Sequence, residues 1–200
     1  MRLPYPLTKL IDELVKLPSI GNKSARRLAF SLLLQPEKSA YDLAEAIIQA
    51  RKNIRSCQTC FGFSEYEVCE VCKDEKRNRE ILCVVEDPKN VFTIESSGVF
   101  QGMYHVLEGA ISPIQGISPD KLRVKELQQR VKAGQFSEII IATNSTLEGE
   151  ATAHYLTDLL QELVEKITRI AMGMPIGSDL EFTDINTLER SFEGRTSLNR

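Results

Sequence analysis

Apolar residues recur every three or four positions through the first 54 residues, and this spacing predicts three α-helices. The first is expected over residues 7–17 and ends before Pro18, the second begins at Asn22 or Lys23, and the third runs from Pro36 to about residue 54. Their apolar faces consist of Leu7, Leu10, Ile11, Leu14 and Leu17, then Ala25, Leu28, Ala29, Leu32 and Leu33, and finally Leu43, Ala46, Ile47 and Ala50. These helices form a small helical module.

Beyond residue 80 the pattern changes to short, continuous apolar runs separated by helical stretches. The runs at residues 81–85, 138–142 and 167–171 predict strands, and the stretches at 88–95, 121–132 and 150–164 predict helices. Strands that alternate with helices imply a parallel sheet with crossover helices. The expected fold class is therefore multi-part, α and α/β: an N-terminal helical module, a small cysteine module, and a parallel α/β domain with a C-terminal extension.

The boundaries of these parts follow from the changes of pattern. We expect a helical module at residues 1–56, a cysteine module at 57–76, an α/β domain at 77–175 and a C-terminal segment at 176–200. The 200 residues are 42% hydrophobic and 26% charged, which is usual for a soluble globular protein and argues against disorder. The sequence contains neither an apolar run of membrane-spanning length nor a signal-peptide core, so a cytoplasmic protein is expected.

The charge is unevenly distributed, although the formal net charge is only −3. Residues 1–55 contain ten Lys and Arg against five Asp and Glu, whereas residues 81–200 contain 11 against 17. A basic front end favours a polyanionic partner, and an acidic remainder favours a partner of another kind. Unevenly charged solvated surfaces would give the same asymmetry, so charge alone selects no function.

Four cysteines form two closely spaced pairs, Cys57 with Cys60 and Cys69 with Cys72, with eight residues between the pairs. Two such pairs bring four sulfur atoms onto one tetrahedral ion, which suits Zn²⁺. Two disulfides are the alternative, but a reducing cytosol disfavours them, and a redox pair would not need the second pair. One structural Zn²⁺ per chain is predicted, because four thiolates leave no open coordination position. Cys83, inside an apolar run, is expected to be buried and inert.

Residues 17–29 connect the first two predicted helices and resemble a helix-hairpin-helix motif, which binds the DNA backbone. A tight turn with Gly21 leaves backbone N–H groups free at the start of the second helix, where the helix dipole favours a phosphate. Lys23 and Arg27 are four residues apart and share a helix face, and Arg26 is a weaker candidate. Contacts to phosphate carry little sequence information. The alternative is a structural turn with a solvated basic face, and Ser19 departs from the motif, which usually has glycine there.

Acidic residues follow two of the predicted strands in a pattern that resembles a Toprim domain, the metal-binding fold of topoisomerases, bacterial primases and some nucleases. Glu86 ends the first strand, and Glu148 and Glu150 match the Glu-Gly-Glu of the motif. In catalytic members two Asp complete the Mg²⁺ site, but Asn144 and Thr146 occupy those positions here. The loss of two anionic ligands removes most of the affinity for hydrated Mg²⁺, so we expect no catalysis.

The three glutamates are expected to lie close together, because ligands in parallel α/β sheets gather at the carboxyl ends of strands. Glu86, Glu148 and Glu150 would then form an exposed acidic patch suited to a basic protein surface. One alternative function is a Toprim-type, Mg²⁺-dependent phosphodiesterase or nuclease that uses the same three residues. Another is a zinc-stabilised adaptor that binds only protein. His105 and His154 match no ligand pattern and are expected to be structural.

The order of these parts, together with residues 104–113 and 169–181, resembles the RecR family of bacterial recombination mediators over essentially the whole chain. The resemblance implies a DNA repair and recombination protein that is not an enzyme and that binds single- and double-stranded DNA without sequence preference. It also implies a homotetrameric ring with oligomer contacts in the C-terminal segment, acting in the cytoplasm at the nucleoid. The implied partners are RecO, bound by the acidic patch, and RecF, with which the family loads RecA onto gapped single-stranded DNA.

Overall fold

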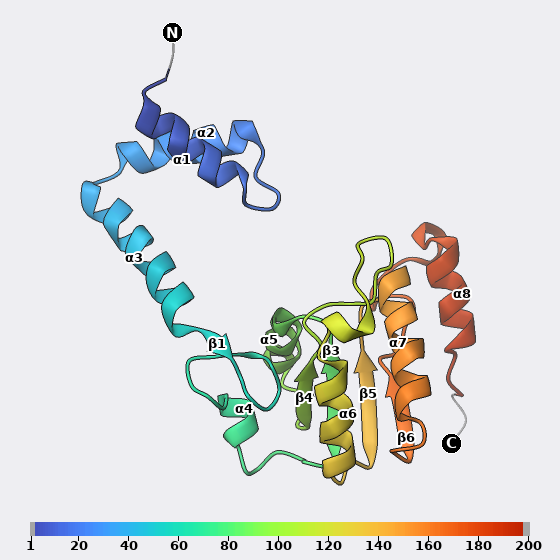
Figure 1. The fold of residues 1–200 in the computed structure, drawn as a ribbon. Coiled ribbons are helices and arrows are strands. Elements are labelled where there is room, and N and C mark those ends of the chain that lie inside the picture. Colours follow the sequence, from blue (N-terminus) through green and yellow to red (C-terminus); the bar gives the residue numbers. More distant parts are fainter. Residues whose placement is uncertain (1–2, 198–200) are drawn as a thin grey trace. The chain divides into compact units, whose positions relative to one another are not determined.

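The computed structural model describes residues 3–197, so the first two and the last three residues of the predicted terminal segments lie outside the described residues. The described chain divides into two compact units, the first ending at Ile54 and the second beginning at Arg55 (Figure 1). The cysteine module and the α/β domain share one hydrophobic core within the second unit. The finer division of that unit at residues 77 and 176 stays a prediction.

Three helices form the first unit, close to the positions that the apolar spacing predicts: α1 (Tyr5–Val15), α2 (Asn22–Leu34) and α3 (Glu37–Asn53). Leu7 and Ile11 of α1 pack against Ala25 and Ala29 of α2, and both alanines are fully buried. Most of the remaining predicted apolar faces stay exposed, since no residue of α3 is buried and the leucines of α2 lie outside the small core. Among the residues that the structure describes, these helices therefore carry apolar side chains that are exposed.

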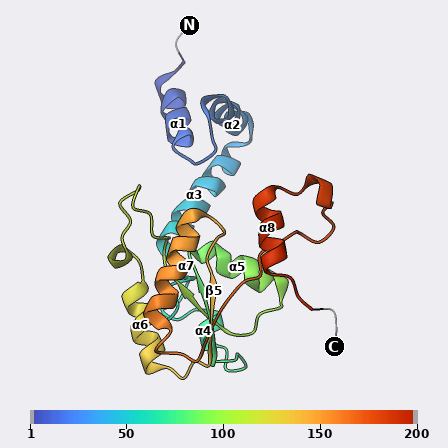
Figure 2. The same ribbon diagram turned by 90° about the vertical axis from the view of Figure 1, so that its right-hand side faces the viewer.

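The second unit is built on a four-stranded parallel sheet with the order β4-β3-β5-β6. Its strands are β3 (Ile81–Val85), β4 (Met103–Val106), β5 (Glu138–Ala142) and β6 (Lys166–Arg169). The crossover helices are α5 (Pro88–Ser97), α6 (Val124–Ala133) and α7 (Leu147–Leu160). Helices α6 and α7 cover one face of the sheet and α5 covers the other, which gives three layers (Figure 2). The predicted fold class is confirmed.

Strand β4 was not predicted from the apolar pattern, because two polar side chains interrupt its short run. Tyr104 and His105 are nevertheless fully buried, and each has a hydrogen-bond partner inside the fold. The Tyr104 hydroxyl donates to Glu95 at 2.6 Å, and His105 Nε2 lies 2.9 Å from the carbonyl oxygen of Arg123. A strand of this kind cannot be distinguished from a loop by periodicity alone, since its burial depends on partners that are distant in the sequence.

Several element boundaries also differ from those predicted. Helix α7 begins three residues earlier than expected, because the Thr146 side chain caps it by accepting a hydrogen bond from the Gly149 N–H at 3.1 Å. Helix α6 begins three residues later, after a short 3₁₀ helix at Pro119–Lys121. The last strand, predicted at residues 167–171, is shifted to Lys166–Arg169.

The cysteine module, called the finger below, consists of a two-stranded antiparallel pair, β1 (Arg55–Ser56) and β2 (Phe63–Ser64), followed by the short helix α4 (Glu70–Lys73). Arg77 attaches the chain after α4 to the sheet. Its side chain is only 8% exposed, pairs with Glu95 of α5, and donates to the Gly102 carbonyl at 3.0 Å. The chain that leaves the finger after its last cysteine is thus fixed to the α/β layers.

After β6 the chain forms a 3₁₀ helix at Leu180–Phe182 and helix α8 (Ile185–Glu193), which lies on the same side of the sheet as α5 (Figure 2). The Asp184 carboxylate caps α8 by accepting a hydrogen bond from the Thr187 N–H at 3.0 Å. Ile185 and Phe192 are 83% and 64% exposed, so α8 presents an apolar stripe to solvent. Within residues 3–197, no helix has both the length and the apolar character needed to cross a membrane.

Candidate functional site

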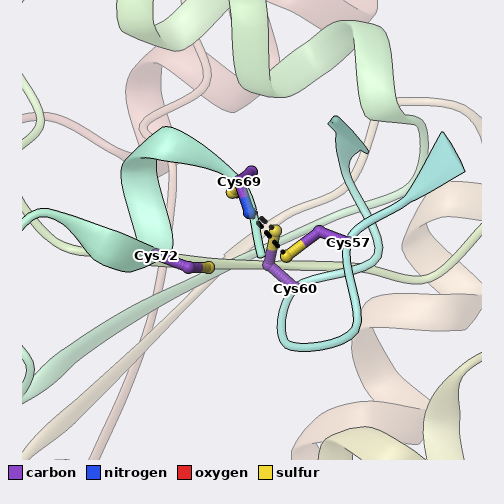
Figure 3. Close-up of side chains that lie close together, drawn as sticks. All are labelled: Cys57, Cys60, Cys69 and Cys72. Carbon is purple, nitrogen blue, oxygen red and sulfur yellow. Dashed lines mark hydrogen bonds between the residues drawn. The ribbon is translucent and has the colours of Figure 1, made fainter. Parts of the chain in front are cut away.

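The four predicted cysteine ligands converge at one point of the finger (Figure 3). Cys57 and Cys60 lie between β1 and β2, Cys69 immediately precedes α4, and Cys72 lies within it. The four Sγ atoms all lie within 4.8 Å of one another. All of the cysteines, including the buried Cys83, carry free thiols, so the alternative of two disulfides is wrong.

Backbone N–H groups are directed at these sulfur atoms. The Cys69 N–H lies 3.3 Å from Cys57 Sγ, and the Gly62 N–H lies 3.4 Å from Cys60 Sγ. Hydrogen bonds from the Cys60 and Cys72 thiols lower the pKa of Cys69, which favours its thiolate form. A nearly closed pocket of four sulfur donors fits Zn²⁺, which would be held by these cysteines and would cross-link the finger without an open position for a substrate.

The loop that carries Cys60 covers one free edge of the sheet. The Val106 N–H of the edge strand β4 donates to the Cys60 carbonyl at 2.8 Å, and all four residues of β4 are buried. Three of the cysteines, Cys57, Cys60 and Cys72, belong to the same hydrophobic core as the sheet. Because an uncovered edge strand offers backbone groups to other chains, the finger also protects the sheet.

Glu86 lies at the C-terminal end of β3, where its side chain meets the loop that follows β5. Although only 8% of Glu86 is exposed, both carboxylate oxygens are satisfied by Asn144. One oxygen accepts the Asn144 backbone N–H at 2.9 Å, and the other accepts its side-chain amide. An aspartate at position 144 would bring a second negative charge in place of this donor. Asn144 therefore satisfies the hydrogen-bonding capacity of a buried carboxylate.

The start of α7 is packed tightly against this pair. The Thr143 hydroxyl donates to the Gly149 carbonyl at 2.9 Å. A Cβ atom on Gly149 would lie 2.0 Å from the Asn144 carbonyl oxygen and 2.8 Å from a Glu86 carboxylate oxygen, so only glycine fits there. The glycine of the Glu-Gly-Glu motif is explained by this close approach of the helix to Glu86.

The other two predicted acidic residues have different surroundings. Glu150 pairs with Arg169 of β6 at 2.7 Å and lies 3.9 Å from Arg190 of α8, whereas the half-exposed Glu148 carboxylate forms no ion pair within residues 3–197. The expectation of an exposed patch of three free carboxylates is wrong for Glu86, which is buried, and for Glu150, which is paired. The role of these residues in partner binding stays a prediction, and Glu148 is its best-placed member.

The residues at this edge do not fit Mg²⁺. Both oxygens of Glu86 are occupied, Asn144 and Thr146 are neutral, and Thr146 is engaged as the cap of α7. Among the residues that the structure describes, the four cysteines form the only group of three or more His, Cys, Asp or Glu side chains whose ligand atoms converge. A hydrated Mg²⁺ ion is usually anchored by one or two carboxylates. Here Glu86 and Glu150 are engaged by Asn144 and Arg169, which leaves only Glu148.

The predicted DNA-binding residues lie at the turn between α1 and α2. Ser19 has a φ of 65°, the left-handed conformation that usually requires glycine, so the hairpin forms despite this departure from the motif. Gly21 precedes α2 with an extended backbone, and no side chain caps the helix. Lys23, Arg26 and Arg27 are exposed, and α2 contains no acidic residue. Their role in binding DNA stays a prediction.

Arg169 is the residue of the sheet edge that sequence reasoning missed. Besides pairing with Glu150, its guanidinium lies 3.4 Å from both the Thr143 hydroxyl and the Asn144 carbonyl oxygen. It thereby ties β6 to the loop that holds Glu86. The available signal was weak: a single cation in the middle of the short run at residues 167–171, which is otherwise apolar or neutral.

Four models of known protein families match most of the chain. Residues 7–51 match the model for the RecR helix-hairpin-helix, and residues 54–74 match the model for the RecR zinc finger domain with four cysteine ligands. Residues 80–171 match the Toprim domain, and residues 173–196 match the RecR C-terminal region. The zinc-finger match and the convergent sulfur atoms together confirm the predicted zinc site.

Full-length relatives agree with these models. The chain is 51% identical over 198 residues to the recombination protein RecR of Carboxydothermus hydrogenoformans, covering 99% of this chain and 100% of the relative. It is 50% identical over 198 residues to the protein of the same name from Geotalea uraniireducens, with the same coverage. It is 47% identical over 193 residues to that of Pelotomaculum thermopropionicum, covering 96% of each chain.

Replacing a zinc ligand tests the metal centre. We expect Cys72→Ser to lose the bound zinc and to unfold the second unit at a markedly lower temperature, because the binding energy of a structural zinc is largely folding energy. Elemental analysis and thermal unfolding of the freshly purified, reduced chain measure both effects. Cys83→Ala is the matched control, since Cys83 is buried but is not a ligand, and it should retain one zinc per chain. Wild-type protein without zinc would contradict this prediction.

Proposed function

The chain belongs to the RecR family of recombination proteins, and from this premise we propose that it is a non-enzymatic DNA-binding clamp that mediates DNA repair by recombination. The observation that supports a non-enzymatic role most directly is the Glu86–Asn144 pair, which occupies the carboxylate that a catalytic Toprim domain would use for metal. In this proposal the first unit binds DNA. The sheet edge around Glu86, Glu148 and Glu150, called the acidic edge below, binds a protein. Association with the nucleoid follows from the DNA-binding role.

The hairpin has the chemistry needed to bind phosphate. Three exposed cations, Lys23, Arg26 and Arg27, lie near the start of α2, where uncapped backbone N–H groups and the helix dipole favour an anion. The absence of acidic residues from α2 leaves this charge uncompensated within the helix. Contacts of this type read the backbone and not the bases, so single- and double-stranded DNA should both bind without sequence preference.

The acidic edge is assigned to RecO. Glu148 lies in the first turn of α7, next to a groove of about 960 Å³ between the loop after β5 and α8. Carboxylates at the rim of an interface raise the association rate with a basic partner and select against an acidic one. Together with RecF, the complex would load RecA onto gapped single-stranded DNA, as the family resemblance implies.

A homotetrameric ring is supported by two separate apolar surfaces. On α3, Leu43 and Ile47 are 45% and 62% exposed. Together with Ala40, Ala50 and Ile54 they recur every three or four residues, which is the spacing of side chains along a seam between two helices. On α8 the stripe of Ile185 and Phe192 forms the second surface. Two different self-complementary interfaces are sufficient to close a ring of four chains. The mass in solution should therefore be four times the chain mass of 22.5 kDa, and a stable monomer would contradict the ring.

Removing two cations from the hairpin tests DNA binding. We expect the double variant Lys23→Ala, Arg27→Ala to bind all DNA sequences more weakly. The slope of log affinity against log salt concentration should fall by roughly 0.7–0.9 for each lost phosphate contact. The matched control, Arg51→Ala with Lys52→Ala, removes the same charge from the end of α3 and should change binding much less. Unchanged DNA binding by the hairpin variant would show that the hairpin is only a structural turn.

Reversing one charge tests the protein interface. Glu148→Lys should weaken RecO binding by about tenfold, because a cation at the rim would repel a basic surface. Titration calorimetry against purified RecO measures the affinity, and zinc content and DNA binding by the hairpin should stay normal. Glu162→Lys, on an exposed position beyond the end of α7, is the matched control. Equal losses for both variants would argue against a specific role for Glu148.

A further inference from the structure

Two residues of the second unit have a left-handed backbone although neither is glycine. Phe61, which follows the ligand Cys60, and Glu108, which follows β4, both have φ of 64°. This conformation is unfavourable for a residue that carries a Cβ atom, so the surrounding structure must hold each of them in place. Both are in contact with the same side chain, that of Arg123.

Arg123 connects the finger to the sheet through its side chain. Its guanidinium lies 4.9 Å from the centre of the Phe61 ring. The same group donates to the Glu108 carboxylate at 2.8 Å and to Glu126 at 2.9 Å. A guanidinium can stack on a ring and bind two carboxylates at once, whereas a lysine ammonium cannot reproduce this planar arrangement.

The Arg123 backbone reinforces the same connection. Its N–H donates to the Leu107 carbonyl at 3.0 Å, and its carbonyl oxygen lies 2.9 Å from Nε2 of the buried His105. The His105 ring in turn makes an edge contact with Phe61, with ring centres 5.3 Å apart. Phe61 is thus held between an arginine and a histidine that both belong to the α/β layers.

Glu108 lies directly next to the candidate protein-binding edge. The Gly109 N–H donates to the backbone carbonyl of Glu86 at 2.8 Å, and the loop that follows is fastened to α7 where the Ile111 N–H donates to Thr152 at 2.8 Å. The tip of this loop is exposed, with Ile114 at 96%. A change in the backbone of Glu108 would therefore move both the loop and the chain around Glu86.

We propose that Arg123 is a positioning residue that links the zinc finger to the loop at residues 108–118. With zinc bound, Cys60 and with it Phe61 would be held in place. The Phe61 ring orients the guanidinium, and the guanidinium holds Glu108 in its left-handed conformation. When the finger loosens, Arg123 loses the face on which it stacks, and Glu108 returns to an ordinary backbone conformation. The shape of the edge around Glu86 then depends on a metal site that it does not touch.

Hydrogen exchange of the zinc-loaded, full-length chain, read by mass spectrometry, tests this link. Phe61→Leu keeps the four cysteines but removes the ring, and Arg123→Ala removes the bridge. Both variants should keep one zinc per chain and show exchange at residues 107–118 about tenfold faster than wild type, since loss of local contacts lowers the free energy of local opening. Arg123→Lys should restore part of the protection, because it keeps an ion pair with Glu108 but not the stacking.

The control is Lys125→Ala, which removes an exposed cation from the first turn of α6 and should leave exchange unchanged. If Phe61→Leu altered exchange only within the finger, the proposal would be overturned, because no signal would reach the loop. Wild-type exchange at residues 107–118 in zinc-loaded Arg123→Ala would overturn it as well. If Phe61→Leu loses its zinc, exchange at residues 107–118 in zinc-loaded Arg123→Ala alone decides whether the proposal holds.

Discussion

The hydrogen bond from the Val106 N–H to the Cys60 carbonyl joins the finger to the sheet. The remaining features of the second unit depend on this contact. It places a metal-binding loop along the free edge of a parallel sheet, so that an edge strand is buried as completely as a central one. That burial allows β4 to carry Tyr104 and His105, whose hydroxyl group and Nε2 atom find partners in α5 and just before α6. A zinc site of this kind contributes to the folding of the α/β layers as well as to its own loop.

At the C-terminal end of β3, the fold buries the carboxylate of Glu86. A buried carboxylate requires either a cation or several hydrogen-bond donors. Glu86 is supplied with two donors by a single residue, Asn144, and the glycine at position 149 lets α7 approach closely enough to enclose the pair. The same strand ends that gather metal ligands in catalytic relatives of the fold therefore hold a closed hydrogen-bond network here, with Glu148 left facing solvent.

The features that the sequence predicted well depend on neighbours in the chain. Helical spacing, the two cysteine pairs and the motif residues around Glu148 are all local patterns, and the helices, the zinc ligands and the fold class followed from them. The features that it did not predict depend on contacts between distant segments. Strand β4 is recognisable only with the finger against it, and Arg169 and Arg123 act on residues 19 and 15 positions away, respectively. The burial of Glu86 belongs to the same class, because its partner lies 58 positions along the chain.

We infer that this Toprim edge is closed by hydrogen bonds and performs no metal-dependent chemistry. The most direct test is to incubate the zinc-loaded, nuclease-free chain with gapped DNA in Mg²⁺ or Mn²⁺ and to measure strand cleavage. We expect the DNA to remain intact with either ion, because the Glu86 oxygens are already occupied. Cleavage that requires the metal and disappears in Glu86→Gln would contradict this claim and assign the edge to a nuclease.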